Sequence, residues 1–374
     1  MTLPTPSSPS DSESPAPSVR AAVWSVAIWA APLVPVAMMA VLWWLPEHVF
    51  ALSASTLVGL ALIDAVWPRS ASVVPPRPRN RSLVSMLLPR VNGVLLLAML
   101  ALALLVGSQL SWGSAWGLGA AMGLIMGLHG VAVGHQLGHS PRRRDKALAW
   151  ALLSLSACPQ FMVEHYRGHH PRAATWDDAT SAREGESLWQ YLIRALPQAF
   201  GNAVRLERLW LVQRHKPTHQ SKLLRATAVM LLVLVASCVL FGLRAGLMLL
   251  VQGGVAVLMV ESVNYIEHYG LVRKDEPGHR VPFAAEHGWN ANRPMAHVLL
   301  LGRPRHSDHH LQPWKRATEL QAVEAPELPL GYLASVLLAW IPPLWFAHTQ
   351  PLLDLLHRRL REGPTTTSSL SGSA

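Results

Sequence analysis

Nine histidines between Gly134 and Leu311 fall in four short motifs, each near the boundary of an apolar segment. Imidazole is the commonest neutral metal ligand, and histidines at i, i+3 and i+4 project from one face of a helix. One such pair often sits on a solvated helix face, but three clusters together with His268 favour a metal centre. The predicted ligands are His135, His139, His165, His169, His170, His268, His306, His309 and His310.

The number of imidazoles indicates more than one ion. Four ligands complete a closed zinc site, so nine suit two first-row metals with open positions. Imidazole binds iron, copper, zinc and nickel alike, and ligand type alone therefore does not choose the metal. Neutral ligands leave the charge of the cations uncompensated, so we expect carboxylates to orient the imidazole N–H groups. The carboxylates inside the motifs are Glu164, Glu267 and Asp308.

The composition is typical of a membrane protein that crosses the bilayer several times. Of the 374 residues, 51% are hydrophobic and only 14% are charged. Cys158 and Cys238 lie in apolar stretches and form no C-x-x-C pair, which excludes a fused rubredoxin-like module and favours two buried thiols over a disulfide. The net charge of +10 does not indicate nucleic acid, because basic residues alternate with apolar spans and form no stripe with stacking aromatics.

The predicted fold class is an all-α integral membrane protein with six transmembrane helices and a cytosolic, histidine-rich catalytic domain. A spanning helix needs about 20 apolar residues. The expected spans are 21–44, 48–66, two within 91–134 folded back near 107–113, 226–243 and 245–263. The expected organisation is a disordered tail over 1–20, four spans within 21–134, a cytosolic region over 135–225 with the first two motifs, two spans within 226–263, a cytosolic region over 264–355 with the remaining motifs, and a tail over 356–374.

The basic residues predict the orientation. With both termini in the cytosol, 31 of the 32 Lys and Arg residues lie inside, and the outer turns hold only Arg244. All four motifs then reach one membrane-proximal cytosolic layer. Two further apolar stretches are expected not to cross: 147–163, because crossing would separate His139 from His165, and 328–353, because Pro342 and Pro343 would break the helix.

The motifs resemble those of the integral-membrane alkane hydroxylases, or alkane 1-monooxygenases, within the membrane fatty-acid desaturase and hydroxylase superfamily. Three histidine boxes are shared with the superfamily, and NYIEHYGL at 264–271 resembles the hydroxylase branch. Four further motifs also resemble that branch: SAREGES at 181–187, HGWNAN at 287–292, ELPLGY at 327–332 and PPLW at 342–345. The resemblance covers roughly 21–355.

The resemblance implies two iron ions and an O₂-dependent hydroxylation of the terminal methyl of medium- or long-chain alkanes. It also implies electrons from a rubredoxin, with a rubredoxin reductase upstream; the missing C-x-x-C module makes that donor a separate protein. The expected location is the inner membrane of a bacterial cell, with the active site on the cytosolic side and the substrate taken from the lipid bilayer. Basic residues at Arg205, Arg208, Arg214, Lys216, Lys222 and Arg225 attract either anionic lipid or, in part, an acidic rubredoxin.

The chain departs from the family pattern in the first two boxes, at Pro304 just before the third box and after His310. The first box usually has Glu where this chain has Gln136, and the second usually has Asn where this chain has Tyr166. We expect both, together with the intramembrane His129, to line the substrate cavity. The glycine-rich stretch 117–130 predicts either close helix packing or a channel for a linear chain.

Two alternative functions remain open at this point. One is a related hydroxylase or desaturase acting on another apolar substrate, such as an aromatic methyl or an acyl chain. The other is a metal-handling transporter or sensor, whose polar ligands should lie near the bilayer midplane along a pathway. Neither alternative nor the main hypothesis predicts a nucleic-acid partner.

Overall fold

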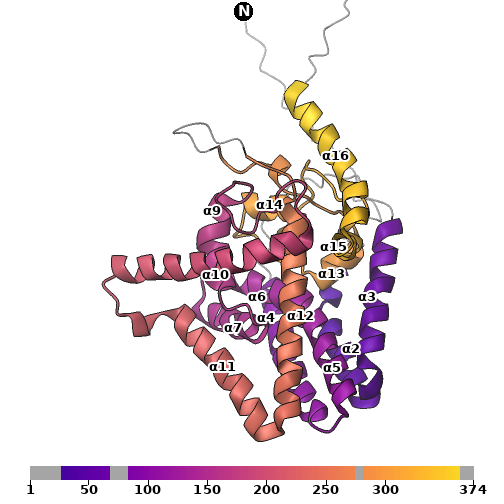
Figure 1. The fold of residues 1–374 in the computed structure, drawn as a ribbon, viewed down its shortest axis with the longest axis vertical. Coiled ribbons are helices and arrows are strands. Elements are labelled where there is room, and N and C mark those ends of the chain that lie inside the picture. The colour runs from indigo at the N-terminus through magenta and orange to yellow at the C-terminus, as the bar shows by residue number, and fades with distance from the viewer. Residues whose placement is uncertain (1–26, 68–82, 274–280, 363–374) are drawn as a thin grey trace, which may run out of the picture.

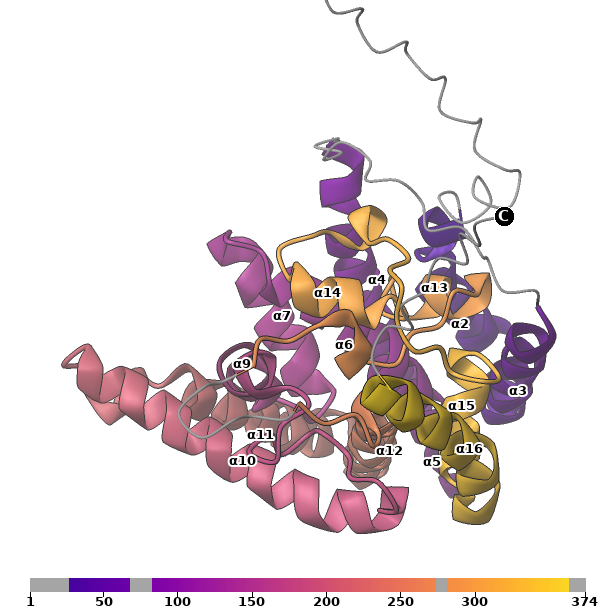
Figure 2. The same cartoon turned by 90° about the horizontal axis from the view of Figure 1, so that it is seen from above.

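The computed structural model describes residues 27–67, 83–273 and 281–362, and its regular elements there are helices (Figures 1 and 2). The α-helices are α2 (Leu33–Trp44), α3 (Val49–Val66), α4 (Leu83–Gly107), α5 (Trp112–Ile125), α6 (Val131–Gly138), α7 (Arg143–Leu155), α8 (Phe161–Glu164), α9 (His170–Arg172), α10 (Leu188–Gln213), α11 (Lys222–Phe241), α12 (Leu243–His268), α13 (Pro294–Leu299), α14 (His306–Leu311), α15 (Tyr332–Ala339) and α16 (Pro342–Glu362). Single turns lie at Ile28–Ala30, Pro46–His48, Thr218–Gln220, Ala285–His287 and Ala317–Glu319, and two π-helical segments lie at Met126–Gly130 and His165–His169.

Five helical stretches are long and apolar enough to cross a membrane: Pro46–Val66, Leu83–Gly107, Trp112–Gly138, Lys222–Phe241 and Leu243–His268. They correspond to the second through sixth predicted spans. The first predicted span begins outside the described residues, and its described part, Ile28–Trp44, is a shorter apolar helix. The protein therefore has several membrane-spanning helices, whereas the count of six and the orientation of the termini stay predictions.

The two apolar stretches expected not to cross are broken in the structure. Residues 147–163 are divided between α7 and the four-residue α8. The stretch 328–353 is interrupted after α15, and Pro342 starts α16, where a missing backbone N–H costs nothing.

Helix α16 continues to Glu362, seven residues past the boundary expected at 355, and the predicted tail over 1–20 lies outside the described residues. Both cysteines are free thiols, as predicted.

Helices α5 and α12 pack in close contact through a row of glycines. A Cβ atom at Gly119 would lie 2.5 Å from the carbonyl oxygen of Met248, one at Gly123 would lie 2.7 Å from that of Gln252, and one at Gly127 2.6 Å from that of Ala256. Each four-residue step on one helix matches a four-residue step on the other in the same direction, so the two helices run parallel in one register. At these three positions the glycine-rich stretch serves helix packing, as expected where small residues let backbones approach in lipid.

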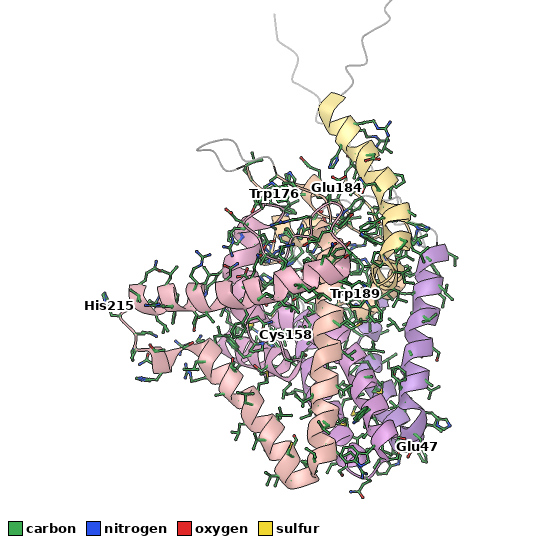
Figure 3. All side chains as sticks on the ribbon, viewed as in Figure 1. Glu47, Cys158, Trp176, Glu184, Trp189 and His215 are labelled. Atoms are coloured by element: carbon green, nitrogen blue, oxygen red, sulfur yellow. The ribbon has the colours of Figure 1, made fainter. Side chains whose placement is uncertain are left out.

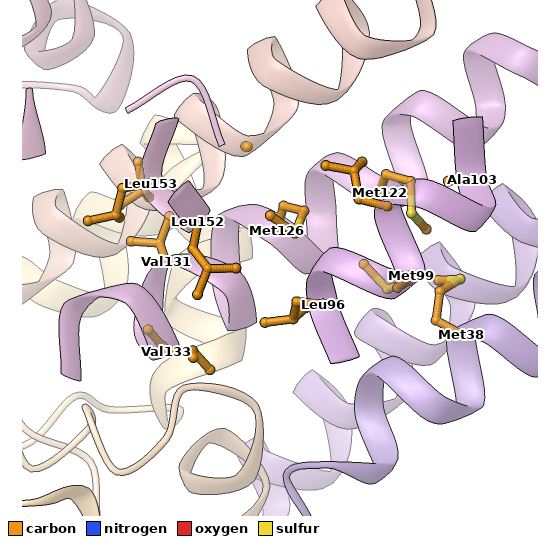
Figure 4. Packing of buried hydrophobic residues seen from close by; sticks show 14 of the residues in the cluster. Met38, Leu96, Met99, Ala103, Met122, Met126, Val131, Val133, Leu152 and Leu153 are labelled. Atoms are coloured by element: carbon orange, nitrogen blue, oxygen red, sulfur yellow. The ribbon is translucent and has the colours of Figure 1, made fainter. Parts of the chain in front are cut away.

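The glycine register places two histidine-bearing ends side by side. The span containing α5 and α6 ends at Gly138 and the span formed by α12 ends at His268, so both deliver their histidines to the same end of the bundle (Figure 1). Met122, Met126, Leu96 and Met99 fill the neighbouring core (Figure 4). This packing fixes how far each histidine lies along the bundle axis.

Replacing Gly123 or Gly127 by alanine should loosen the contact between α5 and α12. The added methyl group meets backbone atoms of α12, and overpacking of this kind costs about 1–3 kcal/mol. We expect the apparent melting temperature in detergent to fall by about 3 °C or more, measured by the loss of the monodisperse peak after heating. Gly254→Ala is the matched control, because nothing lies within 4 Å of its Cβ position. Equal melting temperatures for all three variants would contradict the packing argument.

Candidate metal centre

The structure brings the nine predicted histidines together as two separate groups. The five-imidazole group contains His135, His139, His165, His170 and His309, and the four-imidazole group contains His169, His268, His306 and His310. Within each group, one ring nitrogen from every member lies within 4.8 Å of the others. Each group could therefore hold one metal ion.

The inward-facing atoms are Nε2 atoms at the spacing of metal ligands. In the five-imidazole group, Nε2 of His135 lies 3.0 Å from that of His309 and 3.3 Å from that of His139. In the four-imidazole group, the Nε2 atoms of His268 and His306 lie 2.9 Å apart. Nitrogens bound about 2.0–2.1 Å from one cation would be separated by about 2.9 Å at a right angle and about 3.4 Å at a tetrahedral angle. The donor set therefore fits a metal ion of this size.

Contacts on the outer side of the rings fix which nitrogen carries the proton. Nδ1 of His268 lies 2.9 Å from the carbonyl oxygen of His287, and Nδ1 of His169 lies 2.8 Å from Oδ2 of Asp178. Both acceptors require a proton on Nδ1, so the Nε2 atoms present lone pairs to the centre of the group. Such converging lone pairs repel one another unless a cation lies between them, which supports metal binding on the geometry alone.

Burial keeps six of the imidazoles outside the spans neutral. Removal from water lowers the pKa of His139 to about 3, and the charge of Arg303 adds to that effect. Desolvation likewise lowers the pKa of His165, His170, His306, His309 and His310. Neutral imidazole is the form that binds metal, so these ligands need no deprotonation near neutral pH.

A π-helical turn divides the second motif between the two groups. In a regular α-helix His165 and His169 would share a face, as the spacing predicted. In the π-helical segment His165–His169, Nε2 of His165 instead meets that of His170 at 3.1 Å, while Nε2 of His169 meets that of His310 at 3.2 Å in the other group. The single-face expectation is therefore wrong for this motif, and the cause is the wider turn.

Among the three predicted carboxylates, Glu267 lies beside a ligand. Its Oε1 atom is 3.1 Å from Nδ1 of His306, and its carboxylate accepts two hydrogen bonds of 2.7 Å from the buried Arg303. Arg303 also donates to Oδ1 of Asn264 at 2.9 Å. Glu267 is thus placed to orient His306 and is itself held by Arg303.

Glu164 and Asp308 have other partners than the expected imidazoles. Oε1 of Glu164 pairs with Arg172 at 3.3 Å, and Asp308 accepts hydrogen bonds from Lys315 at 2.8 Å. A nearby cation thus pairs with each carboxylate, and their expected role beside the metal centre stays a prediction. Burial raises the pKa of Glu164 to about 7.

Sequence reasoning missed Asp178 and Arg303. Asp178 is buried and accepts hydrogen bonds from His169 and, at 2.7 Å, from Ser181. Burial alone would raise the pKa of Asp178, but His169 and these hydrogen bonds outweigh it and hold the pKa below its usual range. The sequence held one indication of each residue. Asp178 lies three residues before the SAREGES motif, and a buried Glu267 needs a cation such as Arg303.

The three residues expected to line a substrate cavity have different surroundings. Both ring nitrogens of His129 bond within the bundle, Nδ1 to the carbonyl of Leu299 at 2.7 Å and Nε2 to Asn92 at 2.9 Å, so His129 connects helices. The hydroxyl of Tyr166 donates to the backbone oxygen of His135 at 2.8 Å. His129 and Tyr166 thus make hydrogen bonds that connect segments of the structure, and their expected cavity role stays a prediction.

Gln136 lines a cavity of about 410 Å³ together with His139, Arg90, Arg142 and Arg316. The same lining contains Asp145, which pairs with Arg90, and apolar residues such as Leu88 and Leu137. A second space of about 20 Å³ lies against His165 and His169, one from each group, and is large enough for a water-sized molecule.

Comparison with known proteins identifies the family. The model of the fatty acid desaturase family matches residues 110–341, more than half of the chain. The chain belongs to the fatty acid desaturase family. It is 38% identical to alkane 1-monooxygenase 1 of Pseudomonas aeruginosa over 226 residues, 59% of each protein. It is 35% identical to the alkane 1-monooxygenase of Acinetobacter baylyi over 59% of this chain and 55% of that protein. It is 28% identical to the xylene/toluene monooxygenase hydroxylase component of Pseudomonas putida over 58% of each. The alignments thus span less than two thirds of these relatives.

The contact between Asp178 and His169 can be tested through metal content. Asp178→Asn removes the carboxylate that holds the ring of His169, and losses of about 10- to 100-fold in metal affinity are typical for such partners. We expect the purified variant to lose about half of its bound metal, that of the four-imidazole group, in elemental analysis after dialysis against a weak chelator. Asp177→Asn is the control, since Asp177 is exposed and should leave the metal content unchanged. Full metal retention in Asp178→Asn would contradict the assignment.

Proposed function

We propose that this protein is a membrane-bound non-haem di-iron monooxygenase that hydroxylates the terminal methyl of medium- or long-chain alkanes to 1-alkanols. The observation that carries the proposal is the division of nine buried or half-buried histidines into two groups of converging Nε2 atoms at one end of the spans. Family membership and the 38% identity to an alkane 1-monooxygenase support the reaction type.

The chain's own residues would perform three tasks. Nine imidazoles would hold two iron ions, which when bound supply the activation of O₂. Glu267 and Asp178 fix the rings of His306 and His169, so the ligand nitrogens are oriented before any metal arrives. Burial at the end of apolar helices limits water and lets an alkane enter from lipid, in which it dissolves readily.

The position of the two groups argues against a metal transporter. A transporter places its polar ligands near the bilayer midplane, along a pathway through the helices. Here the ligands on spanning helices, His135 and His268, lie in the last turn of each helix. Such a closed layer at one end is typical of an enzyme that accepts a substrate from the membrane.

Activity on octane tests the proposed reaction. Inner membranes containing the protein, supplied with iron, rubredoxin, rubredoxin reductase and NADH, should convert octane to 1-octanol with one oxygen atom from O₂, detected by mass spectrometry with ¹⁸O₂. His309→Ala should abolish the product, because its Nε2 lies 3.0 Å from that of His135 and 3.2 Å from that of His170. His348→Ala is the control, since His348 lies on α16 outside both groups. Absence of product across chain lengths, with iron loaded, would refute the proposal.

The match to a xylene/toluene monooxygenase component supports a second candidate, hydroxylation of an aromatic methyl group. Parallel assays with octane, p-xylene and an acyl chain separate the candidates. Oxygen insertion identifies a hydroxylase, whereas loss of two hydrogens identifies a desaturase. The ratio of turnover on octane to turnover on p-xylene decides between the two hydroxylase substrates.

We propose that the protein lies in the inner membrane of a bacterium, with its metal centre on the cytosolic side. We propose that its electron donor is a separate rubredoxin that docks on that side. Rubredoxins are small and acidic, and the chain carries a net charge of +10. We expect the rate of reduction, at limiting rubredoxin, to fall steeply as ionic strength rises, because exposed charges are screened over about 8 Å at physiological salt. Stopped-flow reduction at several salt concentrations measures this. A salt-independent rate would rule out electrostatic docking.

A further inference from the structure

Helix α10 lies across the membrane-spanning helices, and both of its ends are attached at the level where the spans end (Figures 1 and 2). Near its start, the hydroxyl of Tyr191 donates to Glu261 of α12 at 2.9 Å, two turns before α12 ends at His268. Near its end, Glu207 accepts a hydrogen bond of 2.8 Å from the backbone N–H of Lys222, the first residue of the candidate span α11. A helix fixed at this level at both ends runs along the boundary between lipid and water.

One face of α10 is apolar but exposed. Its buried residues, such as Tyr191, Ala195 and Ala199, form one stripe, on the side where α10 packs against α8. Beside that stripe lie four large apolar side chains at intervals of four, seven and four residues, which place them on one face. This apolar stripe consists of Trp189, Ile193, Phe200 and Val204, and their exposed fractions are 45%, 79%, 47% and 47%. Exposure of this extent is costly in water and favourable among acyl chains.

The far end of α10 and the turn after it are basic. The basic tip consists of Arg208, Arg214 and Lys216, all exposed, and Figure 3 shows the neighbouring His215 at the end of the hairpin, remote from the bundle. Arg214 and Lys216 lie 5.4 and 5.1 Å from the ring of Trp210, a residue type that favours the membrane interface. The one carboxylate of this region, Glu207, is buried and paired with Arg167 at 2.9 Å, so it does not offset the exposed charges.

We propose that α10 is an interfacial helix whose apolar stripe lies among the acyl chains and whose basic tip binds the phosphates of anionic phospholipids. The apolar stripe and the basic tip occur together on a helix that a short connection, 214–221, joins to the candidate span α11. This combination favours a lipid surface over an acidic protein, which would meet the charges without needing the stripe. Because α10 also packs against α8 and the π-helical segment that carries His165 and His169, the bound lipid would support the side of the metal centre formed by these elements. The proposal does not depend on the reaction catalysed.

The depth of the stripe is tested with single cysteines carrying an environment-sensitive fluorophore, in liposomes that contain spin-labelled lipid. Val204→Cys lies in the stripe, and Gln198→Cys lies on the exposed polar face of the same helix. The label at 204 should shift to the blue and be quenched several-fold more than the label at 198. The unmutated protein gives the labelling background of the two native cysteines. Cys158 is buried, and the Sγ atom of Cys238 packs against Gly246. Equal quenching at both positions, or none at either, would overturn the placement.

Lipid selectivity is tested by counting phosphatidylglycerol retained by the purified protein from nanodiscs of mixed phosphatidylglycerol and phosphatidylcholine, using native mass spectrometry. The triple variant Arg208→Gln, Arg214→Gln, Lys216→Gln should lower the affinity for phosphatidylglycerol about tenfold, because each basic residue near the surface contributes to anionic-lipid binding. The control triple Arg183→Gln, Arg358→Gln, Arg359→Gln removes the same charge from other exposed positions and should retain the lipid. Unchanged lipid retention in the tip variant, or loss of rubredoxin binding with lipid retained, would overturn the proposal.

Discussion

The convergence of unprotonated imidazole nitrogens is the constraint on which the rest of the structure depends. Bringing the Nε2 lone pairs of His268 and His306 to 2.9 Å in a buried site is unfavourable unless a cation compensates them. Several rings of the four-imidazole group are contacted from their outer side. Asp178 and the carbonyl of His287 accept hydrogen bonds from Nδ1 of His169 and His268, which also selects the tautomer that exposes Nε2. Glu267 lies 3.1 Å from Nδ1 of His306.

The ring contacts in turn require that helices from distant parts of the chain stop at the same level. The glycine row on α5 and the π-helical segment after it sets that level, because contact between Gly119, Gly123 and Gly127 and the backbone of α12 allows a single register. A shift by one turn would move His135 by about 5.4 Å relative to His268. Such a shift exceeds the 4.8 Å within which the ring nitrogens of one group lie, so the packing between these helices also determines the geometry of the two groups.

The sequence predicted which nine histidines gather at one end of the spans, but not how they are shared between two groups. Histidine type and spacing were enough to select nine residues, and uncharged length was enough to place five spans. The division into groups of five and four depends on a π-helical turn at His165–His169, for which side-chain periodicity gives no indication because regular helices were assumed. Carboxylates were predicted from their place inside the motifs, and Glu267 is the one whose oxygen lies 3.1 Å from a ring nitrogen of the nine histidines. The direction of Glu164 and Asp308 is decided by Arg172 and Lys315, which adjacency to a histidine does not indicate. Asp178 was missed because its partner His169 lies nine residues away across a loop.

The carboxylates make the two groups chemically unequal. Asp178 and Glu267 contact His169 and His306, which both belong to the four-imidazole group. A carboxylate that accepts a hydrogen bond from a ligand ring makes that ring more basic and partly compensates the charge of a bound cation. Arg303 neutralises much of the charge of Glu267, since it donates two hydrogen bonds of 2.7 Å to it. Asp178 has hydroxyl partners and His169 but no comparable guanidinium among its hydrogen bonds in the described residues. The negative charge that would offset a cation in the four-imidazole group therefore comes mainly from Asp178, acting through His169. His169 lies at the π-helical turn where the two groups meet.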